Sequence, residues 1–280
     1  MIINTAINQA FLELKKSKVK SALLDSEILM SKAIEKNREY IALNSNKELD
    51  KKHYEYYKEL ISNRIKGKPI AYIIGKKQFW NYEFDLNDKV LIPRPDTELI
   101  VEQVLNIYKN KSNINLLEIG IGSGCIILSI LKEKKYFLGK GIDLSKECLK
   151  ICNINAKKLN VSNRLKLFKT DVDNFKIGKY DLIISNPPYI NKLDLNNLGK
   201  DIINFEPKLA LDGGIDGLSE IRKVINKSSE LIKKNGKLIL EIAFDQKKRV
   251  SELLINKGFY INKVLKDLAN NDRCIISTKI

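Results

Sequence analysis

The sequence is poor in the residue types on which metal and redox chemistry depend. Its 280 residues include a single histidine, His53, and four cysteines, none of which forms a Cys-x-x-Cys pair. A structural zinc site needs four closely spaced nitrogen or sulfur ligands, so no metal site is expected. Cys148 and Cys152 lie four residues apart on a predicted helix and are interpreted as small buried apolar residues. Unpaired thiols favour a cytoplasmic protein.

Long apolar segments are also missing. No run of 18 or more apolar residues occurs, so no membrane span is expected. Residues 1–5 lack the basic segment and following apolar stretch of a secretory signal, and no export signal is expected. Hydrophobic residues nevertheless make up 44% of the chain, which is enough for a sizeable core. This composition excludes a disordered chain and a collagen-like fibre.

Arginine is scarce in a chain of strongly positive charge. The formal net charge is +16, yet only seven of the 50 basic residues are arginine. Nucleic-acid sites favour arginine for bidentate and stacked contacts, whereas lysine is a hydrated point charge. The lysines are scattered among many asparagines and isoleucines, which favours compositional drift over a nucleic-acid footprint. An anionic partner surface is the alternative interpretation.

Residues 1–75 are predicted to be helical, because apolar residues recur at helical spacing until Gly67-Lys68-Pro69 ends the pattern. Residues 76–95 predict a β-hairpin linker that finishes in Pro93-Arg94-Pro95. Asp96-Thr97-Glu98 then provides a capping residue and early acidic charge for a further helix.

Residues 96–280 alternate strands with helices, which predicts a doubly wound α/β domain. A final antiparallel pair completes a seven-stranded, mostly parallel, Rossmann-like sheet. The expected strands are Asn115–Ile119, Leu138–Asp143, Leu165–Asp171, Tyr180–Ser185, Lys237–Ala243, Gly258–Leu265 and Arg273–Thr278. The expected helices are Cys125–Lys132, Lys146–Leu159, Ile215–Lys233 and Asp245–Asn256.

A glycine-rich loop follows the first of these strands and precedes a helix. It reads Gly120-Ile121-Gly122-Ser123-Gly124, a spacing that differs from the Gly-x-Gly-x-x-Gly of dinucleotide folds. Glycines there let the backbone approach a ligand closely. Asp143 ends the next strand, where a carboxylate accepts hydrogen bonds from both hydroxyls of a ribose. The pair predicts an adenosine-containing cofactor.

Asp171 ends the third strand, where its side chain or an adjacent amide would meet an adenine amino group. Val172, or alternatively Phe175, is expected to flank the adenine ring.

Asn186-Pro187-Pro188-Tyr189 follows the fourth strand, at the sheet edge where open α/β folds bind ligands. The two prolines fix the backbone. A rigid Pro187 carbonyl and the Asn186 side-chain oxygen make two acceptors, which suits a planar –NH₂ group. Tyr189 is expected to stack on that plane.

Together these motifs resemble class I S-adenosylmethionine-dependent methyltransferases that act on planar nitrogen. More specifically, the chain resembles the release factor glutamine methyltransferases, the PrmC/HemK family. The resemblance spans nearly the whole chain and rests most on three segments: Ile92-Pro93-Arg94-Pro95-Asp96-Thr97-Glu98, Ser185-Asn186-Pro187-Pro188-Tyr189-Ile190 and Phe205-Glu206-Pro207-Lys208-Leu209-Ala210-Leu211-Asp212-Gly213-Gly214. Three departures are Glu118, where the family usually has Asp, Ala243, where Gly is common, and Ala269-Asn270-Asn271, where a Gly-containing turn usually precedes Arg273.

The resemblance implies an enzyme that methylates the glutamine of the Gly-Gly-Gln loop in peptide chain release factors 1 and 2, with S-adenosylmethionine as cofactor. Asn186, Pro187 and Tyr189 would be catalytic, Pro188 would join them in binding the substrate, and Asn186 would also meet the cofactor. Glu118 would face the methionine amino group, and the N-terminal helices would dock the release factor. We expect a cytoplasmic monomer that contacts neither nucleic acid nor membrane.

Two other interpretations remain at this point. An adenine-N6 methyltransferase shares Asn-Pro-Pro-Tyr, but it would need a region with arginine and aromatic residues to flip and read a base. Residues 1–75 contain only Arg38 and Arg64. The second is a non-enzymatic protein that binds the cofactor at a degenerate site, although every motif residue is present.

Overall fold

The structure, a computed structural model, describes residues 1–280 and divides into two compact units. The smaller unit comprises Met1–Gly75 and Lys200–Phe205, and the larger comprises Lys76–Gly199 and Glu206–Ile280. No helix combines the length and apolar character needed to cross a membrane.

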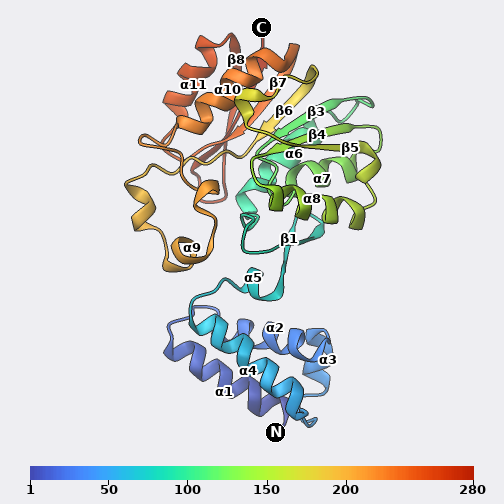
Figure 1. Ribbon diagram of the computed structural model, residues 1–280, viewed down its shortest axis with the longest axis vertical. Coiled ribbons are helices and arrows are strands. Elements are labelled where there is room, and N and C mark those ends of the chain that lie inside the picture. Colours follow the sequence, from blue (N-terminus) through green and yellow to red (C-terminus); the bar gives the residue numbers. More distant parts are fainter. The chain divides into compact units, whose positions relative to one another are not determined.

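The smaller unit is entirely helical (Figure 1). Its helices are α1 (Ile3–Lys16), α2 (Ala22–Ile34), α3 (Arg38–Leu43), α4 (Lys51–Ile65), α5 (Ile70–Ile74) and α9 (Lys200–Phe205). Leu14, Leu29 and Met30 are fully buried in its core. The Tyr57 hydroxyl donates to the Ser26 carbonyl at 3.0 Å, which satisfies the one polar group that this ring brings into the core. The helical character expected for this region is confirmed.

The sequence predicts helical structure for residues 1–75 without singling out α3 and α5, and it predicts no helix at α9. These three helices span five or six residues each, fewer than two turns, so they carry too little apolar periodicity to be recognised. A local signal does exist for α3, because the Asn37 side chain accepts a hydrogen bond from the Tyr40 amide and caps the helix.

The larger unit contains the seven-stranded sheet, and the predicted fold class is confirmed. Its sheet order is β5-β4-β3-β6-β7-β9-β8, parallel from β5 to β7 with β9 antiparallel to both its neighbours. The strands are β3 (Asn115–Ile119), β4 (Leu138–Asp143), β5 (Leu165–Lys169), β6 (Tyr180–Ser185), β7 (Ile232–Glu241), β8 (Phe259–Lys266) and β9 (Asp272–Lys279). The helices are α6 (Glu98–Ile107), α7 (Cys125–Glu133), α8 (Lys146–Lys158), α10 (Ser219–Leu231) and α11 (Lys247–Asn256).

Helices cover both faces of this sheet, which gives three layers (Figure 1). Successive strand residues point to opposite faces, so Leu116 packs with α6, α7 and α8 while Leu117 packs with α10 and α11. Both leucines are fully buried. The parallel strands are therefore apolar on both sides, as the sequence of β3 and β6 requires.

The hairpin of β1 (Lys76–Phe79) and β2 (Tyr82–Asp85) belongs to the larger unit. Phe79 and Phe84 meet edge to face with ring centroids 6.1 Å apart, and both join the core that contains α6, α7 and α8. The hairpin is thus anchored by apolar burial on the sheet's helical layer.

Asn155 ties the hairpin to the glycine-rich loop. Its Oδ1 accepts from the Asp85 amide at 2.8 Å, and its Nδ2 donates to the Asp85 carbonyl at 3.1 Å and to the Ser123 carbonyl at 3.0 Å. The side chain is fully buried. One asparagine on α8 therefore satisfies three backbone groups, two at the end of β2 and one in the glycine-rich loop.

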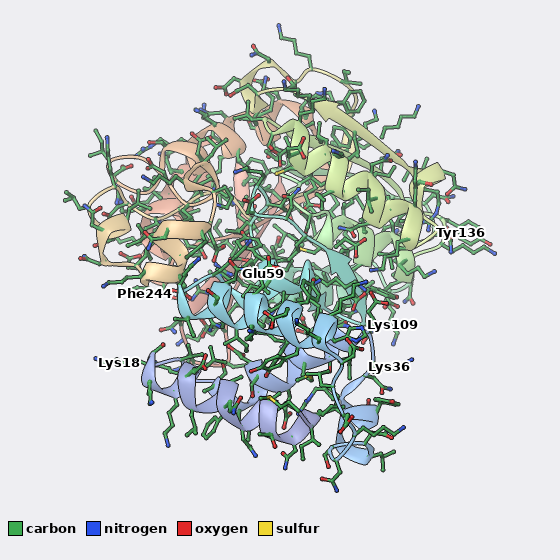
Figure 2. The ribbon with its side chains drawn as sticks, turned by 60° about the horizontal axis from the view of Figure 1, so that its bottom comes forward. Lys18, Lys36, Glu59, Lys109, Tyr136 and Phe244 are labelled. Carbon is green, nitrogen blue, oxygen red and sulfur yellow. The ribbon has the colours of Figure 1, made fainter.

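The excess lysines lie on the surface. Lys18, Lys36 and Lys109 are exposed and point away from the ribbon (Figure 2). They come from both units, so the positive charge is dispersed rather than gathered on one motif.

We predict that Asn155→Ala destabilises the larger unit by about 2–4 kcal/mol, because three buried backbone groups lose their partner. Urea unfolding followed by the fluorescence of Trp80, the single tryptophan, reports on this unit, since Trp80 lies in the hairpin. Asn153→Ala is the matched control, because Asn153 is exposed on the same helix. Equal unfolding midpoints for the two variants would contradict the prediction.

Candidate active site

A cavity of about 520 Å³ lies at the carboxyl ends of the parallel strands. Its size is within the range of small-molecule sites. Because β5, β4, β3 and β6 are neighbours in that order, the residues after them form one continuous wall. The predicted site residues in this wall are Gly120, Ile121, Gly122, Ser123, Asp143, Asp171, Val172, Asn186, Pro187 and Pro188.

Asp143 holds the glycine-rich loop. Its Oδ2 accepts from the Gly122 amide at 3.0 Å, and its Oδ1 accepts from the Ser145 amide at 2.8 Å. Burial raises the pKa of Asp143, and the Gly122 hydrogen bond opposes that shift. The carboxylate therefore fixes two backbone segments while it faces the cavity.

Gly124 differs from the other loop glycines. At Gly120 and Gly122 an added Cβ would meet no protein atom within 4 Å, whereas at Gly124 it would lie 2.6 Å from the Cys152 sulfur. Gly124 also precedes α7 with φ near 80° and is not part of the cavity wall. Its glycine is required by helix packing in this structure, and a contact with the cofactor stays a prediction.

Asp171 and Val172 both reach the cavity, but Phe175 does not. The Asp171 Oδ1 accepts from the Asp173 amide at 2.8 Å, which caps a short 3₁₀ turn (Val172–Asn174). Phe175 is buried against Phe168, with ring centroids 5.5 Å apart. Of the two alternatives only Val172 lines the cavity, and its contact with an adenine ring stays a prediction.

The Asn-Pro-Pro segment lines the cavity directly after β6. The Asn186 Nδ2 donates to the Thr97 Oγ1 at 3.2 Å. Tyr189 lies outside the wall, and its hydroxyl donates to the Glu241 Oε1 at 3.2 Å. Stacking of Tyr189 on a substrate amide stays a prediction.

Thr97 does not cap the helix that follows it. Its hydroxyl donates to the Glu241 Oε2 at 2.6 Å instead, and no side-chain cap bond forms at the start of α6. The expectation of a capping residue here is wrong. A buried carboxylate is the stronger acceptor, and a 3₁₀ turn (Pro95–Thr97) already precedes the helix.

Comparison with known proteins places this geometry in a family. The PrmC N-terminal domain family matches residues 5–75, and the methyltransferase small domain family matches residues 95–267. A release factor glutamine methyltransferase from Clostridium acetobutylicum is 34% identical over 282 residues, which cover 100% of this chain and 99% of that protein. The chain belongs to the release factor glutamine methyltransferase family.

Other relatives are longer than this chain. A bifunctional methyltransferase from Rickettsia conorii is 32% identical, with 99% of this chain and 58% of that protein covered. The chain spans between 52% and 58% of the length of the Rickettsia bifunctional proteins it matches. Among solved structures, a methyltransferase from Pyrococcus furiosus has a TM-score of 0.54 at 19% identity, with 78% of this chain and 96% of that one covered. That likeness supports the fold.

Glu118 is the family departure that lies in the cavity. Its side chain is buried, and its Oε2 accepts from the Ile127 amide in the first turn of α7 at 3.0 Å. Burial raises the pKa of Glu118 well above its usual range. An incoming cation would favour the ionised form of this carboxyl group. Ala243, a second departure from the family pattern, follows β7. The register of β7 with β9 is intact up to the pair of Glu241 and Cys274.

The sequence motifs contain three residues whose contacts in the site they did not reveal: Arg94, Thr97 and Glu206. Arg94 lines the cavity and forms an ion pair at 2.5 Å with Glu206, whose side chain is 2% exposed. Thr97 also lines the cavity, and Glu241 lies behind it. The signal was present in the Pro-Arg-Pro-Asp-Thr and Phe-Glu-Pro segments, but the sequence did not show which residues they meet. No group of three or more His, Cys, Asp or Glu side chains is arranged to hold a metal ion.

We predict that replacing Gly122 and Gly124 by alanine destabilises the protein to different extents. Gly124→Ala should lower the unfolding free energy by about 2–4 kcal/mol, because a clash with Cys152 adds to backbone strain at positive φ. Gly122→Ala should cost about 1 kcal/mol, since its Cβ enters open space. Urea titration with Trp80 fluorescence measures both. Similar losses would show that the packing argument is wrong.

Proposed function

We propose that this protein is an S-adenosylmethionine-dependent methyltransferase that methylates the amide nitrogen of the glutamine in the Gly-Gly-Gln loop of peptide chain release factors 1 and 2. The observation that carries the proposal is a single cavity lined by Gly120–Ser123, Asp143 and Asn186–Pro188. It brings the features expected of an adenosine site next to an acceptor pair suited to an –NH₂ group. Family membership agrees with this assignment.

The residues present fit S-adenosylmethionine. Gly120 and Gly122 leave open space where any side chain would intrude, so a ligand can lie against the loop backbone. Asp143 would accept the ribose hydroxyls, Asp171 and Val172 would meet the adenine, and Glu118 would face the amino group. When bound, the cofactor supplies an electrophilic methyl group on a positively charged sulfur. Asn186 would lie beside the methyl group. Gly124 would contribute to cofactor binding indirectly, by setting the shape of the loop.

The chain's task is then to orient a poor nucleophile. An amide lone pair is delocalised into the carbonyl, so attack on the methyl group requires the nitrogen to be held in line. Asn186 Oδ1 and the Pro187 carbonyl would each accept a hydrogen bond from the substrate –NH₂ group. These two acceptors favour the positive charge that develops on the nitrogen as the new bond forms. The N-methylated amide cation is strongly acidic, so it loses one proton to solvent water after methyl transfer.

Pro188 and Tyr189 would complete the acceptor site. Pro188 stiffens the backbone that presents the Pro187 carbonyl, and it also lines the cavity. Tyr189 is held by Glu241, so its ring has a fixed direction beside the Asn-Pro-Pro segment. Stacking on the glutamine amide would require only that the amide extend past Pro188.

Residues 1–75 form a helical domain, and we propose that this domain docks the release factor. Residues 76–95 connect this domain to residues 96–280, the methyltransferase domain. The dispersed lysines would steer encounter with an acidic partner surface. We also propose that the protein acts as a monomer in the cytoplasm, where release factors act.

The decisive test supplies methyl-labelled S-adenosylmethionine together with purified release factor or, in parallel, DNA and RNA. We expect label only in the release factor, and mass spectrometry of its Gly-Gly-Gln peptide should place one methyl group on the glutamine. Label in adenine would instead establish the nucleic-acid alternative. Binding of cofactor without transfer to any of these acceptors would support a non-enzymatic role.

Asn186→Ala should lower the turnover number about 100-fold or more, because one of the two acceptors that orient the nitrogen is lost. Affinity for S-adenosylmethionine should change little, since the ribose and adenine contacts remain. Asn226→Ala is the control, because Asn226 is exposed on α10. Near-normal methylation by the Asn186 variant would refute its catalytic role.

Asp143→Ala should weaken S-adenosylmethionine binding by about 10–100-fold, because hydrogen bonds to a charged acceptor contribute about 1.5–3 kcal/mol. Isothermal titration calorimetry measures this affinity directly. Asp143→Asn is the intermediate control, since the amide keeps one acceptor oxygen. Unchanged affinity in both variants would remove Asp143 from the cofactor site.

A further inference from the structure

A chain of hydrogen bonds joins the cavity to a buried acid behind it. Asn186 Nδ2 donates to Thr97 Oγ1 at 3.2 Å, Thr97 donates to Glu241 Oε2 at 2.6 Å, and Tyr189 donates to Glu241 Oε1 at 3.2 Å. Glu241 is 1% exposed and Thr97 is 3% exposed. Glu241 lies outside the cavity wall, whereas Thr97 and Asn186 line it. Its influence on a ligand therefore passes through its hydrogen-bond partners, Thr97 and Tyr189, and through Asn186, which Thr97 contacts.

The direction of this chain follows from the number of hydrogens available. A hydroxyl has one hydrogen, and the Thr97 hydrogen is committed to an ionised carboxylate that can only accept. The Thr97 oxygen is then left with lone pairs, so it must receive a hydrogen from Asn186. Only the Nδ2 end of the asparagine amide carries hydrogens, so Oδ1 is turned away from Thr97.

This constraint matters because an asparagine amide has two ends of nearly equal size. Without a fixed neighbour, Asn186 presents either an acceptor or a donor to the cavity at little steric cost. An –NH₂ group of a substrate is oriented only by an acceptor. A donor in its place would repel it.

We propose that Glu241 is a positioning residue whose carboxylate sets the hydrogen-bond direction through Thr97, so that Asn186 presents Oδ1 to the acceptor amide. This inference rests on the proposed function of Asn186. It assigns a role in the reaction to a residue that touches neither substrate nor cofactor.

The surroundings of Glu241 make this device sensitive to pH. The titratable groups that face it are Asp96, Tyr189, Arg273 and the buried thiols of Cys125 and Cys274. Burial raises the pKa of Glu241 to about 7, against the hydrogen bonds from Thr97 and Tyr189 and the charge of Arg273; Asp96 raises it further. A protonated Glu241 can donate to Thr97, which frees the Thr97 hydrogen for Asn186 Oδ1 and reverses the chain.

The sign of the pH effect follows from this reversal. Asn186 presents its acceptor when Glu241 is ionised, so turnover should fall as the pH drops below about 7. At one unit below the pKa about 10% of the carboxyl groups are ionised, which predicts a decline of about tenfold in the turnover number between pH 8 and pH 6.

The test compares Glu241→Gln with wild type. The glutamine side chain has the same shape but can donate to Thr97, so the turnover number should fall about 10–100-fold and lose its decline between pH 8 and pH 6. The KM for S-adenosylmethionine should change less than twofold. Glu252→Gln controls for the change of charge, since Glu252 is exposed on α11. A Glu241→Gln enzyme within threefold of wild type, with an unchanged pH profile, overturns the proposal.

A second pair of variants keeps the test valid if the glutamine variant does not fold. Thr97→Val removes the hydroxyl and should reduce turnover as Glu241→Gln does, whereas Thr97→Ser retains the hydroxyl and should restore at least half of the wild-type turnover number. Equal losses in Thr97→Val and Thr97→Ser would show that packing, and not the hydrogen-bond direction, is what matters at this position.

A measurement without substrate separates this inference from the proposed function. The side-chain amide signal of Asn186 in ¹⁵N nuclear magnetic resonance spectra should shift with a midpoint near pH 7 in wild type and not in Glu241→Gln. If no release factor is methylated but this titration is observed, the proposed function fails and the relay stands. If methylation occurs while the Asn186 signal is the same in wild type and Glu241→Gln at every pH, the relay fails alone.

Discussion

Burial of carboxylates at the carboxyl edge of the sheet is the constraint on which the site depends. Glu118 lies one residue before the end of β3, and Asp143 and Glu241 end β4 and β7 of the same sheet. Each of these acids would cost several kcal/mol if left unpaired. Each is satisfied from a different segment: the first turn of α7, the glycine-rich loop, and the turn before α6. Pairing the acids therefore also fixes the loops that form the cavity.

The sequence predicted the parts of this arrangement that are local. Gly120–Gly124 lies between a buried strand and a helix, and Asp143 ends the next strand, so sheet topology alone brings them together. The link between Thr97 and Glu241 spans 144 residues, and no periodicity or motif spacing encodes a contact of that kind. The same limit applies to Gly124, whose requirement for glycine depends on the position of Cys152 in a separate helix.

Charge is distributed in opposite ways on the surface and in the site. The chain carries a formal net charge of +16, while buried acids at the strand ends line and support the cavity. Salt screens the fields of lysines exposed to solvent, so their charges bear on encounter with a partner and not on chemistry inside the cavity. Acids within the low-dielectric wall act at short range and are screened far less. The positive net charge of the chain therefore says little about the charge of the ligand. The acids at the cavity are consistent with a cationic cofactor.

Orientation, and not proton abstraction, is the chemical task that this geometry suits. Glu241 has a pKa near that of a general base, but Thr97 and Asn186 stand between it and the cavity, and an asparagine amide does not readily pass a proton on. A glutamine amide also does not need to lose its proton before it attacks, since the N-methylated cation loses it easily afterwards. The buried carboxylate thus contributes most as a fixed acceptor, because its ionised form can only accept and so gives a neutral hydrogen-bond chain a single direction.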